Sequence, residues 1–176
     1  LFCGIVMPLL VAKPSSVELI EKTRRGDRLF VAVALRPESP DDPAAEHLFE
    51  RGTLARILKT LELPNGKLNV IVQGLGRVDI TSIDSVDPYF VGKVQPVAPP
   101  PVEVSVEIEA LVHSVQRQLQ RIVKLPSNLP PEVQDLASAS NNPGGLADLI
   151  AAHLNLAVDE KQLLLETDEI EARLKL

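Results

Sequence analysis

The chain has 176 residues, 45% of them hydrophobic and 24% charged. This composition is typical of one globular domain or two small ones and excludes a disordered chain. The net charge is −6, and no basic run is longer than Arg24-Arg25. Because phosphate binding requires clustered Lys and Arg, nucleic acid is not expected as a main partner. The single cysteine, Cys3, excludes an internal disulfide and an all-cysteine zinc site and fits a reducing cytoplasm.

Residues 2–12 form an apolar stretch that resembles a signal peptide at first sight. The stretch has no basic leader, contains Pro8 in its middle and is too short to span a bilayer. We therefore interpret residues 5–11 as a buried strand, and we expect no membrane association.

A helix is expected after this strand, because Pro14 is followed by Ser15 and Ser16, either of which could cap the helix start. Arg24-Arg25-Gly26 is a typical helix end.

The strands that follow are short and β-prone, and their expected ranges are 29–35, 53–63, 67–72, 77–83 and 89–97. Asn65-Gly66 is the strongest hairpin signal in the sequence, since both residues accept positive φ. Gly74 and Gly76 lie where a bulge or tight bend would help a sheet to close. One sheet curled into a small barrel, with one helix packed against it, is the simplest interpretation of residues 1–97.

The pattern changes after a proline-rich linker at residues 98–102. From residue 103 the pattern is helical. Apolar residues recur at three- and four-residue steps between residues 108 and 123, which predicts a long amphipathic helix. Residues 103–176 are therefore expected to form a helical subdomain, whose last helix, from residue 170, is expected to be truncated at the end of this sequence. In this interpretation residues 130–132 open a short helix and residues 142–145 close it. The fold class is therefore α+β.

No catalytic motif is complete. The dipeptide Gly66-Lys67 lacks the hydroxyl residue of a P-loop, and Gly74-Leu75-Gly76 starts a dinucleotide-binding fingerprint that fails at Asp79. There is no nucleophile elbow and no cysteine- or histidine-based metal motif. We expect no catalytic site, no metal and no cofactor in this chain.

Several segments, in the same order and spacing, resemble the N-terminal substrate-recognition domain of ATP-dependent Lon proteases. The matching segments are residues 4–9 (GIVMPL), 52–57 (GTLARI), 63–66 (LPNG), 70–77 (VIVQGLGR), 89–90 (YF), 145–154 (GLADLIAAHL) and 161–166 (KQLLLE). The chain departs from the family at Cys3, where relatives usually have proline, and in lacking a first strand that relatives carry just before residue 2.

The resemblance implies a PUA-like β-barrel followed by a helical bundle. It implies a non-catalytic domain that recognises unfolded or degron-bearing proteins and holds them for an attached serine protease. ATP and magnesium would be needed only by the ATPase module, and the full protein would be a cytoplasmic homohexamer, whereas this domain alone would be a monomer or a weak dimer.

Substrate binding by such a domain requires exposed apolar side chains near the loops of the barrel. The candidates are Met7, Leu9, Leu10, Leu61, Leu63, Pro64, Tyr89 and Phe90. For Leu9, Leu61 and Phe90 a position in the core is favoured over exposure, whereas Leu63 and Pro64 lie at the predicted hairpin tip.

Other classes of function stay open at this point. The chain could be a free-standing protein-binding module or adaptor with no protease attached. Because PUA-like folds also bind RNA, RNA is a further alternative, although the acidic balance and the 3% aromatic content oppose it. A small-molecule pocket built from an aromatic cage is disfavoured by the absence of tryptophan.

Overall fold

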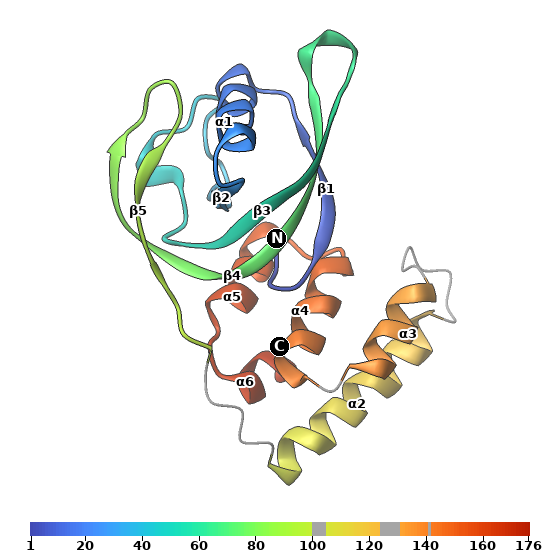
Figure 1. Cartoon of the computed structure of the whole chain (residues 1–176). Helices are drawn as coiled ribbons and strands as arrows, with labels where there is room; N and C mark the ends of the chain where they lie inside the picture. The colour runs from blue at the N-terminus through green and yellow to red at the C-terminus, as the bar shows by residue number, and fades with distance from the viewer. Residues whose placement is uncertain (100–104, 124–130, 141) are drawn as a thin grey trace. The chain divides into compact units, whose positions relative to one another are not determined.

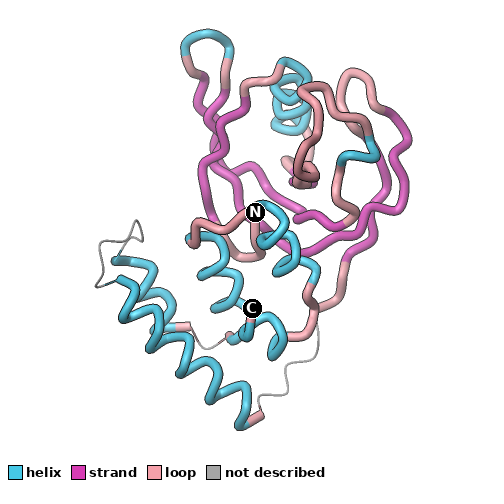
Figure 2. The backbone as a smooth tube through the Cα atoms, turned by 180° about the vertical axis from the view of Figure 1, so that it is seen from behind, coloured by secondary structure: helices cyan, strands magenta, loops and turns pink. Residues whose placement is uncertain are grey.

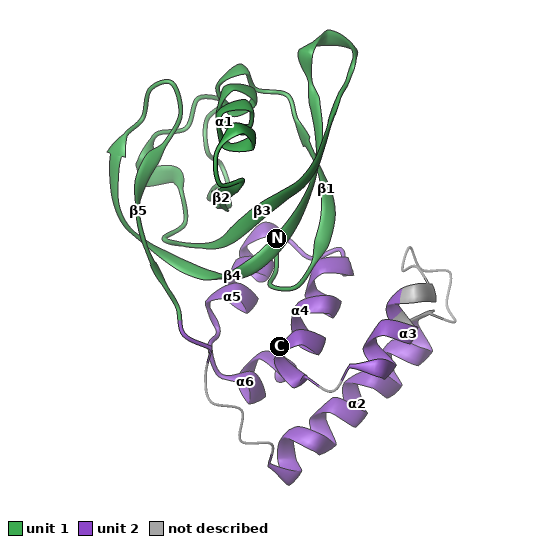
Figure 3. Cartoon of the chain, viewed as in Figure 1, with its two compact units in different colours: residues 1–97 green, residues 98–176 purple. Residues whose placement is uncertain are grey.

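The computed structural model describes residues 1–99, 105–123, 131–140 and 142–176. The chain forms two compact units, Leu1–Val97 and Ala98–Leu176 (Figure 3). The first contains a sheet and one long helix, and the second contains only helices (Figure 1). The predicted α+β class is confirmed. Of the predicted linker at residues 98–102, residues 100–102 lie outside the described part of the chain.

The first unit is an antiparallel sheet of five strands in the order β1-β4-β3-β2, with β5 paired to the second half of β4. Its elements are β1 (Val6–Val11), α1 (Pro14–Arg25), β2 (Leu29–Ala32), β3 (Arg51–Glu62), β4 (Leu68–Ser85), β5 (Val91–Pro96) and the short 3-10 turns η1 (Ala45–His47) and η2 (Pro64–Gly66). The strands curl around α1 (Figure 2). Among the described residues β2 and β5 do not pair, so the curled sheet stays open where the sequence predicts a barrel.

The strand β4 is one continuous element of 18 residues, although the sequence suggests two strands separated by Gly74 and Gly76. The glycines mark a bulge and not a break. Leu54 pairs with Gly76 and Ala55 pairs with Gly74, so Leu75 is the extra residue. Gly74 is buried, and a Cβ atom at this position would overlap the carbonyl oxygen of Phe2. A side chain is therefore excluded there.

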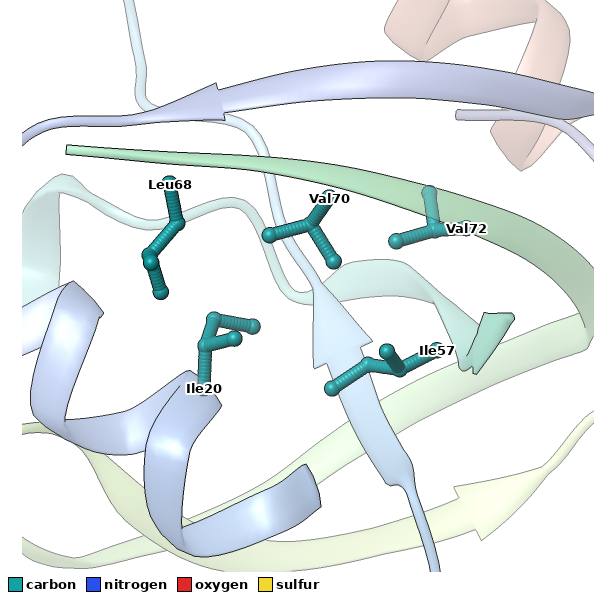
Figure 4. Close-up of a cluster of buried hydrophobic side chains, with 5 residues drawn as sticks. All are labelled: Ile20, Ile57, Leu68, Val70 and Val72. Atoms are coloured by element: carbon teal, nitrogen blue, oxygen red, sulfur yellow. The ribbon is translucent and has the colours of Figure 1, made fainter. Parts of the chain in front are cut away.

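The core of the first unit lies between α1 and the concave side of the sheet. Its fully buried members are Ile20, Ile57, Leu68, Val70 and Val72, whose side chains point toward one another (Figure 4). Three of them alternate along β4, as expected for a strand with one face in the core. This alternation fixes which side of the sheet faces away from the core.

The sequence predicted the turn between β3 and β4 correctly, but it did not predict the cap at the start of α1. Asn65 and Gly66 have φ values of 77° and 71°, as the hairpin signal predicts. At α1 the expected serine cap is wrong. The N-cap residue is Lys13, which makes no side-chain capping bond, because an ammonium group has no acceptor. Pro14 in the first turn fits there because it has no N–H that needs a cap.

The second unit contains five helices among the described residues: α2 (Val106–Val123), α3 (Pro131–Ala139), α4 (Pro143–His153), α5 (Val158–Glu166) and α6 (Ile170–Lys175). Residues 142–145 do not close a helix, as the sequence suggested, but open α4. The Asn142 side chain accepts a hydrogen bond from the Gly145 N–H at 3.1 Å, which caps the new helix.

A buried arginine joins three helices of this unit. The Arg173 side chain is 3% exposed and donates to Asp148 Oδ1 at 3.0 Å. It also donates to the carbonyl oxygens of Thr167 and Asp168, which follow the end of α5. Because a guanidinium carries five donors in a planar fork, one side chain satisfies a buried carboxylate and two backbone acceptors.

Replacing Gly74 by alanine tests the bulge. We expect Gly74→Ala to lower the free energy of unfolding by about 1–3 kcal/mol, because backbone must move to admit the methyl group. The matched control is Gly76→Ala, where a Cβ atom meets nothing within 4 Å and the change should stay within about 0.5 kcal/mol. Urea unfolding followed by circular dichroism measures both. Equal losses would contradict the close contact between the Phe2 carbonyl oxygen and Gly74.

Candidate functional site

The side of the sheet opposite the core carries a three-by-three set of side chains from β1, β4 and β3. Directly paired residues of antiparallel strands share a face, so each row can be read from the register. The rows are Val6–Gln73–Arg56, Pro8–Ile71–Lys59 and Leu10–Asn69–Leu61. We call these nine residues the outer face.

Apolar side chains on the outer face are unusually open to solvent. Leu10 is 66% exposed, Val6 is 52% exposed and Leu61 is 42% exposed. Leu10 and Leu61 both pair with Asn69, so they flank one position of the central strand. Strand spacings of about 4.8 Å put β1 and β3 about 10 Å apart on either side of β4.

The β3–β4 hairpin extends this apolar surface beyond the rows. The hairpin projects from the rest of its unit (Figures 1 and 2). Leu63 is 37% exposed, Pro64 at the turn is exposed, and Leu58 is exposed beside the register shift between Ile57 and Lys59. Several exposed apolar side chains on one hairpin make it a candidate for an interaction surface.

Two of the sequence-predicted candidates do not belong to this surface. Met7 and Leu9 are half-buried and pack against the core cluster that contains Ile20. The expectation that Met7 is exposed is wrong, whereas Leu9 takes the core position favoured for it, because alternate residues of β1 point to opposite faces.

Tyr89 and Phe90 lie in the connection between β4 and β5, outside the strand pairing that joins Leu10 and Leu61. The Lys22 ammonium of α1 lies 5.6 Å from the centre of the Tyr89 ring, and a side-chain hydrogen bond with Tyr89 raises the pKa of Lys22 above its ordinary value. Phe90 lines an apolar cavity of about 280 Å³ together with residues such as Phe30 and Ile83. The structure therefore brings Leu10 and Leu61 to one side of the sheet, puts Leu63 and Pro64 at the hairpin turn that follows Leu61, and leaves Tyr89 and Phe90 outside that group.

Val6, Pro8 and Ile71 are outer-face residues that the sequence analysis did not select. A sequence signal was present only in β4, where Asn69 and Gln73 are polar and Ile71 shares their alternation. In β1 every residue is apolar, so the sequence alone does not reveal which alternate set faces solvent.

The part of the chain that the structure describes contains no cluster of metal ligands and no helix able to span a membrane. No group of three or more His, Cys, Asp or Glu side chains there could hold a metal ion. Within the same ranges, none of the helices has the length and apolar character that crossing a bilayer requires.

The sequence matches one protein family over its whole length. The family model described as the ATP-dependent protease La (LON) substrate-binding domain matches residues 1–176. The chain belongs to this family. Its relatives include the Lon proteases of Anaeromyxobacter dehalogenans, 34% identical over 175 residues, and of Escherichia coli, 34% identical over 171 residues. These alignments cover 99% and 97% of the chain but only 21% and 22% of the relatives, so the chain spans about a fifth of their length.

Solved structures agree on the fold of this Lon substrate-binding domain. The N-terminal domain of Mycobacterium avium complex Lon protease superposes with a TM-score of 0.72 at 23% identity, covering 99% of this chain and 88% of that one. A Lon N-terminal domain protein from Xanthomonas campestris gives 0.70 at 19% identity, with 99% and 89% covered. The resemblance inferred from the sequence segments is thereby confirmed.

Neighbouring leucines on β1 test the assignment of faces. We expect Leu9→Ser to lower the free energy of unfolding by about 1–3 kcal/mol, since it puts a hydroxyl against the core. Leu10→Ser should change it by less than about 0.5 kcal/mol, because Leu10 is exposed. Urea unfolding measures the free energy of unfolding of both variants. A larger loss for Leu10→Ser than for Leu9→Ser would mean that Leu10, and not Leu9, faces the core.

Proposed function

We propose that this domain captures unfolded or degron-bearing segments of other proteins through the outer face and the tip of the β3–β4 hairpin. The observation that supports the proposal is the pair Leu10 and Leu61, exposed on either side of Asn69 and continued by Leu63. An unfolded segment presents apolar side chains without a fixed shape, so a shallow apolar surface suits it better than a deep pocket.

The expected strength of this capture is low. Full burial of a leucine is worth about 1.5–3 kcal/mol, and Leu10, Leu61 and Leu63 are already a third to two thirds covered. Each therefore adds roughly 1 kcal/mol when a ligand covers it. The sum of about 3 kcal/mol is less than the roughly 4 kcal/mol of a millimolar dissociation constant, so one copy of the domain binds weakly.

Several copies acting together would overcome this weakness. We place the domain at the start of a cytoplasmic, homohexameric ATP-dependent serine protease, whose ATPase module would use ATP and magnesium while this domain works without a cofactor. Linked sites raise the apparent affinity by about 10²- to 10⁴-fold when a ligand reaches two of them. A folded protein would be released because it presents no long apolar segment.

The second candidate function is a free-standing binding module or adaptor, with the same surface but no attached protease. Both candidates use the same contacts, and they differ in what is linked to the domain. Detection of ATP-dependent proteolysis by the natural full-length protein separates them.

Removing the two flanking leucines tests the proposed surface. The domain is immobilised at high density so that several copies can act together, and a reduced and alkylated, permanently unfolded protein is passed over it. We expect Leu10→Ser combined with Leu61→Ser to reduce binding at least roughly tenfold, which corresponds to about 1.4 kcal/mol of lost apolar contact.

The matched control is Val86→Ser, in the β4–β5 connection, which removes an apolar side chain that is 60% exposed. It should bind like the unaltered domain. Equal loss in both variants, or no loss in either, would contradict the assignment of binding to the outer face.

A further inference from the structure

The charges of the outer face are all of one sign. Of its nine residues two are cationic, Arg56 and Lys59, and none carries a carboxylate. Both cations are exposed, and within the described ranges neither has an ion-pair partner. This local charge contrasts with the net charge of −6 of the whole chain.

The two cations lie beside the apolar residues and not apart from them. Arg56 shares a row with Val6, and Lys59 shares a row with Ile71. The rows are two residues apart along β4, which is about 7 Å. That is also the spacing of side chains i and i+2 in an extended peptide, so alternate side chains of one peptide could meet both cations.

We infer that the outer face selects polypeptide segments in which apolar side chains are combined with acidic ones. This inference rests on the proposed function and names the class of segment that the same surface prefers. Carboxylates of the ligand pair with Arg56 and Lys59 while its apolar side chains cover Leu10 and Leu61. The net negative charge of the domain does not cancel this preference, because salt screens charges beyond about 8–10 Å.

The ligand lies over the face of the sheet and not along its edge. β1 is an edge strand in the described sheet, and Pro8 at its centre has no N–H to donate to an added strand. Nucleic acid fits the face poorly, because the outer face offers two cations and no aromatic ring for base stacking.

Three matched peptides test the selection. Each is an unstructured 15-residue peptide with the same leucines, separated by serine and by either Glu, Gln or Lys. Binding is followed by NMR titration at an ionic strength of about 0.1 M, where charges beyond about 10 Å are screened. We expect the Glu peptide to bind about threefold to tenfold more tightly than the Gln peptide, as two exposed ion pairs allow, and the Lys peptide to bind more weakly than both.

Variants locate the source of the preference. Arg56→Gln combined with Lys59→Gln should abolish the difference between the Glu and Gln peptides and leave the affinity for the Gln peptide unchanged. Reversal of both charges to Glu should favour the Lys peptide. The control is Lys93→Gln, an exposed cation on β5 outside the outer face, which should keep the preference.

The possible outcomes distinguish failure of this inference from failure of the proposed function. Equal binding of the Glu and Gln peptides, or a preference that survives the double variant, overturns the inference while the proposed function stands. Failure of all three peptides to bind overturns both. Tighter binding of a single-stranded RNA of similar length than of the Glu peptide also overturns the inference, and it would assign the cations to nucleic acid.

Discussion

Packing of α1 against one side of β4 is the constraint on which the binding surface depends. Leu68, Val70 and Val72 must face Ile20 to form the core, and a strand has only two sides. Asn69, Ile71 and Gln73 are therefore forced outward, and the register then places β1 and β3 side chains beside them. A slip of one residue would exchange core and surface along the whole strand. The position of the apolar surface is thus a consequence of core formation.

Sequence patterns predicted the parts of this arrangement that depend on local chemistry. The Asn65-Gly66 turn, the long amphipathic helix α2 and the α+β class all follow from residues close together in the chain. The open sheet, the continuity of β4 through Gly74 and the opening of α4 at Asn142 depend on distant neighbours or on competing local signals. In β1 an unbroken apolar run hid the alternation, so Met7 and Leu9 could not be distinguished from Leu10.

Weak, shallow contacts suit a domain that must accept many sequences. A deep pocket would tie recognition to one side chain, whereas exposed leucines on the outside of the curled sheet accept any apolar residue at a modest gain in free energy. The cations among these leucines let the surface distinguish acidic from basic segments although it has no deep pocket. Because exposed ion pairs are individually weak and sensitive to salt, they bias the choice of segment and do not decide whether binding occurs.

An NMR titration of the domain with one protein in its native and its denatured form tests recognition by the outer face directly. The denatured form should shift backbone signals of Leu10, Asn69 and Leu61, and the native form should leave them unchanged. Shifts confined to residues of the helical unit, or equal shifts with both forms, would contradict the claim that the outer face recognises unfolded segments.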